Sequence, residues 1–132
     1  MNEIEWYEYD EEGDVLDVYF VAERRPAWTI ELTPNIMISI DRLRQQVVGL
    51  TFLDYTALVE PTLWGRRSFP VTGLADLPIE EQKLIFTILN HPSVRAWIDV
   101  SVVENLPDSP FNVAHLESPP PGLLTILPVK AA

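Results

Sequence analysis

Residues 36–53, with the sequence IMISIDRLRQQVVGLTFL, decide the fold of this chain. Apolar and polar residues alternate over residues 36–41, a polar segment follows at 42–46, and a second apolar-rich run occupies residues 47–53. Alternation in segments rich in β-branched residues is typical of strands that bury one face. The stretch therefore predicts two strands, and their short connection favours antiparallel neighbours.

The same alternation extends upstream and adds three strands to this pair. They are expected at residues 3–9, 15–21 and 28–33. The acidic segment 10–14 predicts a hairpin turn between the first two strands, because Gly13 can adopt a positive φ. Pro34 ends the third strand, since proline donates no hydrogen bond to a ladder. Consecutive short connections predict an antiparallel meander of about five strands.

The pattern changes in the second half of the chain. Proline and glycine residues interrupt the sequence after Thr56, so no regular element is expected immediately downstream. Residues 78–89 then carry apolar side chains at i, i+3 and i+4 spacing, which predicts one principal helix packed on one face of the sheet. Asp76 is the expected N-cap of this helix, and residues 98–103 predict a short extra strand. The fold class is therefore α+β.

Length and composition place this fold in one domain. The chain has 132 residues, of which 47% are hydrophobic, and this is enough to bury one core. We expect a single domain over residues 1–132, with the sheet in 5–56 and a loop, helix, strand and proline-rich tail in 57–132. The absence of cysteine excludes disulfides, thiolate metal sites and cysteine nucleophiles. Without a secretory signal or a membrane-spanning apolar run, we expect a soluble cytoplasmic protein.

The charge of the chain is strongly negative and unevenly distributed. The formal net charge is −11, and seven acidic residues lie between Glu3 and Asp14 with no basic residue among them. Nucleic-acid binding requires cationic groups that displace counterions from phosphates, so we expect no nucleic-acid partner. The excess of acid is compatible with a basic protein partner, and equally with a role in solubility alone.

No motif in the sequence amounts to a catalytic, cofactor or metal signature. His91 and His115 are the only histidines, and neither has a second ligand at helical or strand spacing. His91 follows the predicted helix, where histidine favours the dipole, so we expect a capping role for it and a structural role for His115. The acidic turn at residues 10–14 lacks the ligand spacing of a calcium loop. We therefore expect neither a cofactor nor a metal, and a non-enzymatic protein rather than an enzyme.

Two functional hypotheses remain open from the residues. The first is a protein-interaction or assembly domain, expected to be a homodimer, in which aromatic side chains of the sheet and the apolar tail meet another surface. The residues predicted for this interface are Tyr7, Tyr9, Tyr19, Leu123, Leu124 and Ile126. The second is a small enzyme or ligand-binding domain with a pocket between sheet and helix. The residues predicted for this pocket are Arg66, Arg67, His91 and His115.

Several segments of the predicted sheet together resemble one known family. They are residues 9–16 (YDEEGDVL), 18–20 (VYF), 36–41 (IMISID), 47–50 (VVGL) and 53–54 (LD). The pattern resembles the domain of unknown function 2283 family of small bacterial proteins, over about residues 5–56. Residues 42–46 depart from it, because the sequence RLRQQ stands where the family has an Asp-rich turn ending in glycine. Tyr55 and Thr56 stand where the family commonly has a serine.

The resemblance implies a compact antiparallel sheet without established catalytic activity. Some members of the family look like partners of small toxin-like proteins, so the resemblance also implies an antitoxin-like or protein-binding role. This implication rests on analogy with the family and not on any residue of this chain.

Overall fold

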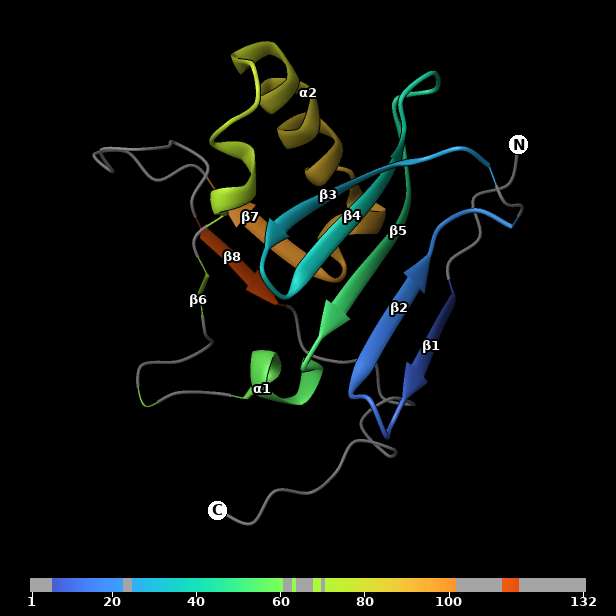
Figure 1. Cartoon of the computed structure of the whole chain (residues 1–132), viewed down its shortest axis with the longest axis vertical. Helices are drawn as coiled ribbons and strands as arrows, with labels where there is room; N and C mark the ends of the chain where they lie inside the picture. The colour runs from blue at the N-terminus through green and yellow to red at the C-terminus, as the bar shows by residue number, and fades with distance from the viewer. Residues whose placement is uncertain are drawn as a thin grey trace.

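The protein folds into a five-stranded sheet backed by helices and by a second, smaller sheet (Figure 1). The computed structural model describes residues 6–22, 25–60, 63, 68–69, 71–101 and 113–116. The five strands of the large sheet are β1 (Trp6–Asp10), β2 (Val15–Tyr19), β3 (Trp28–Thr33), β4 (Ile36–Asp41) and β5 (Gln46–Leu53). The remaining elements are α1 (Tyr55–Val59), β6 (Ser68–Phe69), the 3-10 helix η1 (Thr72–Leu74), α2 (Ile79–Leu89), α3 (Pro92–Arg95), β7 (Ile98–Ser101) and β8 (Val113–Leu116).

The predicted α+β class with five antiparallel strands is confirmed, whereas the simple meander order is wrong. The large sheet has the order β1-β2-β5-β4-β3, so that β5 lies between β2 and β4 in a Greek-key arrangement. The connection between β2 and β3 spans residues 20–27 and contains Pro26, which is too long for a tight hairpin. β2 therefore pairs with β5 instead of with its successor in the chain.

The core lies on one face of the large sheet. Cross-strand pairing aligns one residue from each strand in a single row across this face: Tyr7, Val18, Leu50, Ile38 and Ile30. Helix α2 and the small sheet, of order β6-β8-β7, lie on the same side, behind the large sheet in Figure 1. Their buried residues Ile85, Leu89 and Ile98 complete the core. Each such side chain stabilises the fold by about 1.5–3 kcal/mol relative to its exposed state.

The second half of the chain agrees in part with the predicted elements. The predicted helix is present as α2, but its N-cap is Pro78 and not Asp76. Residue 78 has extended backbone angles, so the helix begins two residues later than an Asp76 cap would require, and the Gln82 side chain donates to the Leu77 carbonyl. The predicted extra strand is present as β7, and residues 102–103 lie outside the described part of the chain. β7 pairs with β8, a strand that no sequence pattern indicated.

Gly73 allows η1 to pack directly on the edge strand β3. A Cβ atom at this position would overlap the carbonyl oxygen of Glu31 and lie 3.3 Å from the Cα of Leu32. Backbone atoms of a strand cannot rotate away as a side chain can, so only glycine fits here. The close approach places η1 over the edge of the sheet, a position where exposed strands are prone to pair with other chains.

We expect Gly73→Ala to lower the free energy of unfolding by roughly 2–3 kcal/mol, because overlap with backbone forces β3 and η1 apart. Chemical denaturation monitored by circular dichroism measures this change. Gly13→Ala is the matched control, since the Cβ there meets the Asp10 carboxylate at 2.8 Å and that side chain can rotate. Equal losses in the two variants would contradict the close-packing argument.

Candidate functional site

The structure describes two of the four residues that were predicted for a pocket. Arg66 and Arg67 lie outside the described residues. His115 belongs to β8, where it pairs in register with Ser68 and Asp99 of the small sheet. His91 stands between α2 and α3 and lines a hollow. His115 is not among the described residues that line this hollow. A pocket that joins all four residues therefore stays a prediction.

His91 has a capping role, but at a different helix end from the one predicted. Its Nδ1 accepts a hydrogen bond from the backbone N–H of Ser93 at 3.2 Å, which caps the N-terminus of α3. The end of α2 is capped instead by Asn90, whose Nδ2 donates to the Phe86 carbonyl at 2.8 Å. Because Nδ1 is an acceptor, the neutral ring carries its proton on Nε2.

The three described residues of the predicted interface lie on two different faces of the large sheet. Tyr7 and Tyr9 point into the core side of the sheet, where Tyr7 packs edge-on against Trp97 with ring centroids 5.6 Å apart. Tyr19 lies on the opposite face and stacks on Trp6 at 5.0 Å. Leu123, Leu124 and Ile126 lie outside the described residues. The three tyrosines therefore do not form one patch.

Tyr9 joins a hydrogen-bonded cluster that ties the first hairpin to α1. Its hydroxyl donates to Asp14 at 2.6 Å, and the same carboxylate accepts from the backbone N–H and the hydroxyl of Thr56. Burial and then the hydrogen bond to Asp14 raise the pKa of Tyr9 above its ordinary value. Asp14, and not Gly13, is the residue of this turn with a left-handed backbone, at φ 54°. The cluster has a structural role, because Asp14 takes the place of an N-cap for α1.

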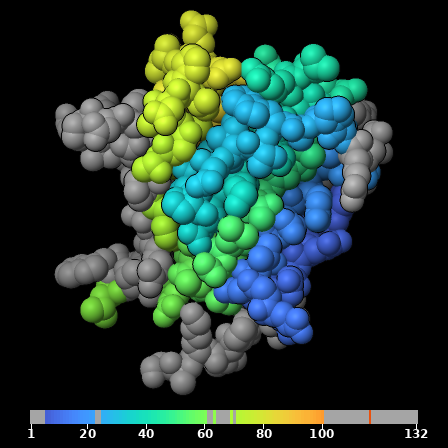
Figure 2. Space-filling view, viewed as in Figure 1, coloured from blue at the N-terminus to red at the C-terminus, as the bar shows by residue number. Residues whose placement is uncertain are grey.

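The outer face of the large sheet, opposite the core, is turned toward the viewer in Figure 2. Glu8 of β1 lies directly opposite Asp17 of β2, and Asp17 accepts a hydrogen bond from Thr51 at 2.7 Å. Two residues along the same two strands, on the same face, lies the stacked pair of Trp6 and Tyr19. We name Trp6, Glu8, Asp17 and Tyr19 the acid–aromatic patch.

The second distinctive feature is the connection between β4 and β5, residues 41–46, which we name the arginine turn. Asp41 is 3% exposed and accepts hydrogen bonds from the backbone N–H groups of Leu43 and Arg44, at 3.1 and 3.2 Å. Its other oxygen accepts from the guanidinium of Arg44 at 2.8 Å and from that of Arg25 at 3.4 Å. Arg25 also donates to Gln46 at 3.0 Å. A buried carboxylate with this many donors holds the turn in one conformation.

The tip of the arginine turn exposes an apolar side chain between two cations. Leu43 is 96% exposed, and no other residue of the turn covers it. The guanidinium of Arg42 lies 4.3 Å above the Trp28 ring and pairs with Glu81 of α2 at 2.8 Å. The side chains of Arg42 and Arg44 remain 57% and 59% exposed. The turn therefore presents an apolar residue and two positive charges to its surroundings.

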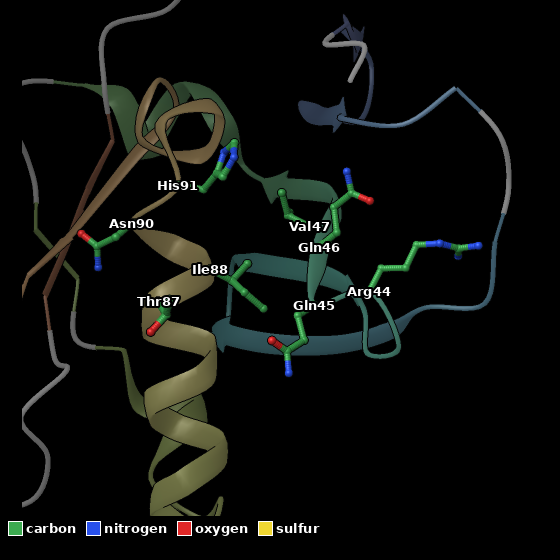
Figure 3. Close-up of a pocket in the computed structure, with 8 residues that line it drawn as sticks. All are labelled: Arg44, Gln45, Gln46, Val47, Thr87, Ile88, Asn90 and His91. Atoms are coloured by element: carbon green, nitrogen blue, oxygen red, sulfur yellow. The ribbon is translucent and has the colours of Figure 1, made fainter. Parts of the chain in front are cut away.

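A hollow lies on each side of this turn. The larger, of about 490 Å³, separates the turn from the end of α2, and Figure 3 shows Ile88 pointing across it toward the turn, whereas Asn90 points away. Its other lining residues include His91, Thr87 and Val47. The smaller hollow, of about 400 Å³, is lined by residues 26–28 and 41–44. No carboxylate lines the larger hollow within the described residues, and its Thr87, Asn90 and His91 side chains all make structural hydrogen bonds.

These features define the class of the protein as an α+β protein built on an antiparallel five-stranded sheet. Residues 6–55, which hold the whole large sheet, match the model of the family described as protein of unknown function (DUF2283). The resemblance stated from the sequence is thus confirmed over this segment. No curated protein and no solved structure matches the chain.

The described ranges hold neither a metal-ligand cluster nor a membrane-spanning helix. No three histidine, aspartate or glutamate residues of these ranges gather closely enough to hold a metal ion. No helix of the described chain is both long and apolar enough to cross a membrane.

Sequence reasoning did not identify the arginine turn as a site. Its one available signal was the departure of residues 42–46 from the family pattern, where RLRQQ replaces an Asp-rich turn. The burial of Asp41 and the position of the turn between two hollows arise from tertiary contacts with Arg25, Trp28 and α2.

We expect the stability added by Asp41 to depend on pH. Its hydrogen bond to Arg44, and then further contacts with Arg44 and Arg25, lower the pKa of Asp41 below its ordinary value. A lowered pKa stabilises the fold fully above the unfolded value of about 3.9, and the stabilisation is lost as pH falls through the folded value. Asp41→Asn keeps the acceptor for the turn but removes the charge, so it should be less stable than wild type at pH 7.

Urea denaturation of both proteins at pH 7 and at pH 3 measures this difference. It should be largest at pH 7 and shrink toward pH 3, where Asp41 of the unfolded wild-type chain already takes up its proton. A difference that is the same at both values would show that the charge of Asp41 does not stabilise the turn.

Gln45 provides a separate test of the turn, because it holds a left-handed backbone with φ 51°. Such a conformation costs a non-glycine residue about 1–2 kcal/mol, and glycine adopts it without that cost but loses more entropy on folding. Gln45→Gly should therefore change the free energy of unfolding by between 0 and about +1 kcal/mol. Gln46→Gly is the control and should destabilise, since Gln46 begins β5 and accepts from Arg25. Thermal denaturation of both variants distinguishes these outcomes.

Proposed function

We propose that this protein is a non-enzymatic protein-interaction domain whose docking element is the arginine turn. The observation that carries the proposal is the almost complete exposure of Leu43 on a turn whose backbone is held by a buried aspartate. An exposed leucine on a mobile loop would contribute little to binding, because its immobilisation costs entropy. A turn that is already ordered loses less conformational entropy when it binds.

The residue types around Leu43 support the same proposal. Arginine and tryptophan are enriched at the energetic centres of protein interfaces, and Arg42 and Trp28 stack directly beside the exposed leucine. The stems of arginine side chains cover apolar area while their guanidinium groups bind carboxylates in a forked geometry. The expected partner surface therefore offers an apolar area for Leu43 and carboxylates for the two arginines.

The hollows on either side of the turn support an interface more than a reaction site. Ile88 and Val47 are buried and give the larger hollow an apolar floor. Its polar side chains are engaged in capping and helix contacts, and its described lining has no acid to act with His91. General acid–base chemistry needs a positioned proton donor or acceptor near a second functional group. The hollows suit apolar side chains that flank the main contact.

A photo-crosslinking experiment tests this proposal. We expect a photoreactive phenylalanine derivative at position 43 to give a discrete crosslinked protein species on illumination in cells. Arg42→Glu in the same chain should reduce the yield severalfold, because it places a negative charge where the partner is expected to be acidic.

The same label at Ile79 is the control, since Ile79 is another exposed apolar residue, 53% exposed, at the start of α2. Position 79 should give no discrete species. If positions 43 and 79 crosslink equally, or if neither does, the arginine turn is not a docking element and the proposal is wrong.

A further inference from the structure

We propose that the partner of the arginine turn is a second copy of this chain, and that the turn docks on the acid–aromatic patch of that copy. This inference rests on the proposed function, because it names the partner of the same docking element. It also assigns a binding role to the outer face of β1 and β2, which the fold does not need for its own core.

The patch has the chemistry that the arginine turn requires. Glu8 and Asp17 are directly opposite each other on neighbouring antiparallel strands, and like charges in this arrangement destabilise a sheet. A guanidinium placed over the pair would donate hydrogen bonds to both carboxylates and relieve the repulsion. Binding of the second copy therefore relieves an electrostatic repulsion between Glu8 and Asp17 that is present in a single copy.

The aromatic half of the patch matches the remaining groups of the turn. Trp6 and Tyr19 stack with an interplanar angle of 21° and form a continuous apolar step beside the two acids. Gly49 follows Tyr19 in the same cross-strand row and adds no side chain to the surface there. Leu43 can pack on this step, while an arginine beside it lies within reach of an aromatic face and a carboxylate.

The positions of the two surfaces on the sheet allow a closed assembly. Because Tyr19 pairs with Gly49, three residues after β5 begins at Gln46, the aromatic half of the patch lies at the same end of the sheet as the arginine turn, on the neighbouring pair of strands. Two copies that face each other across a two-fold axis parallel to the strands keep their turns at the same end and exchange their two sides, so each arginine turn comes toward the acid–aromatic patch of the other copy. Both contacts then form at once, and the assembly ends at a dimer instead of growing into a filament.

Single substitutions at exposed positions test the pairing without disturbing the fold. Leu43→Glu places a carboxylate against Glu8 and Asp17 of the other copy, and Glu8→Arg places a cation against the arginines. Leu43 and Glu8 are both exposed, and Leu43 makes no side-chain contact that the fold depends on. Light scattering after size-exclusion chromatography, over a range of protein concentrations, measures the dimer dissociation constant of each variant.

We expect the wild-type chain to be a dimer, and each single variant to dissociate with a constant roughly tenfold or more higher. An equimolar mixture of the two variants should restore the dimer. One contact then joins position 43 of the Leu43→Glu copy to position 8 of the Glu8→Arg copy, where the charges are opposite, and the second contact is native. The controls are Ile79→Glu and Glu12→Arg, which make the same changes of residue type at other exposed positions and should remain dimeric.

Three results would overturn this inference: a monomeric wild-type chain, a dimer that neither variant weakens, or a mixture that stays monomeric. Circular dichroism of each variant confirms that it is folded before its mass is interpreted. A monomeric wild-type chain that still crosslinks another protein through position 43 would reject the self-pairing and leave the proposed function standing. Absence of both the dimer and the crosslink would reject the two proposals together.

Discussion

The pairing of β5 with both β2 and β4 is the constraint on which the rest of the structure depends. β1 and β2 form one hairpin, and β3, β4 and β5 form a consecutive antiparallel unit. β5 is the longest of the described strands, with eight residues, and its buried Val47, Leu50 and Phe52 join the cores of the two units. Without this central strand, two small sheets would each expose an edge and half of an apolar face.

The position of β5 also determines where the candidate site lies. Because β5 begins at Gln46, the residues just before it leave the sheet at the end that faces α2. Asp41 is then enclosed at the last position of β4, where an unpaired charge would be costly. Its four donors from Leu43, Arg44 and Arg25 offset that cost, and they also order the segment that carries the exposed leucine. The same carboxylate thus stabilises the turn and fixes the position of the exposed leucine.

The fold separates acidic and basic groups along the large sheet. The overall excess of acid conceals an arrangement in which the acidic hairpin turn and the arginine turn occupy opposite ends of one sheet. A molecule with separated charges of this kind orients an approaching partner before contact is made. Between the two ends lies the outer face of the sheet, where Thr29 and Ser39 are hydrogen-bonded across β3 and β4.

The sequence by itself determined the local elements: the five strands, the helix α2 and the strand β7 follow from spacing that neighbouring residues set among themselves. It did not determine that β5 separates β2 from β4, that Tyr9 and Tyr19 lie on opposite faces of the sheet, or that Asp41 is buried. Strand order, burial and the enclosure of the arginine turn depend on contacts between residues far apart in the chain. Alternation specifies that a strand has two faces, and only the packing of the whole chain decides which face is covered and what stands beside it.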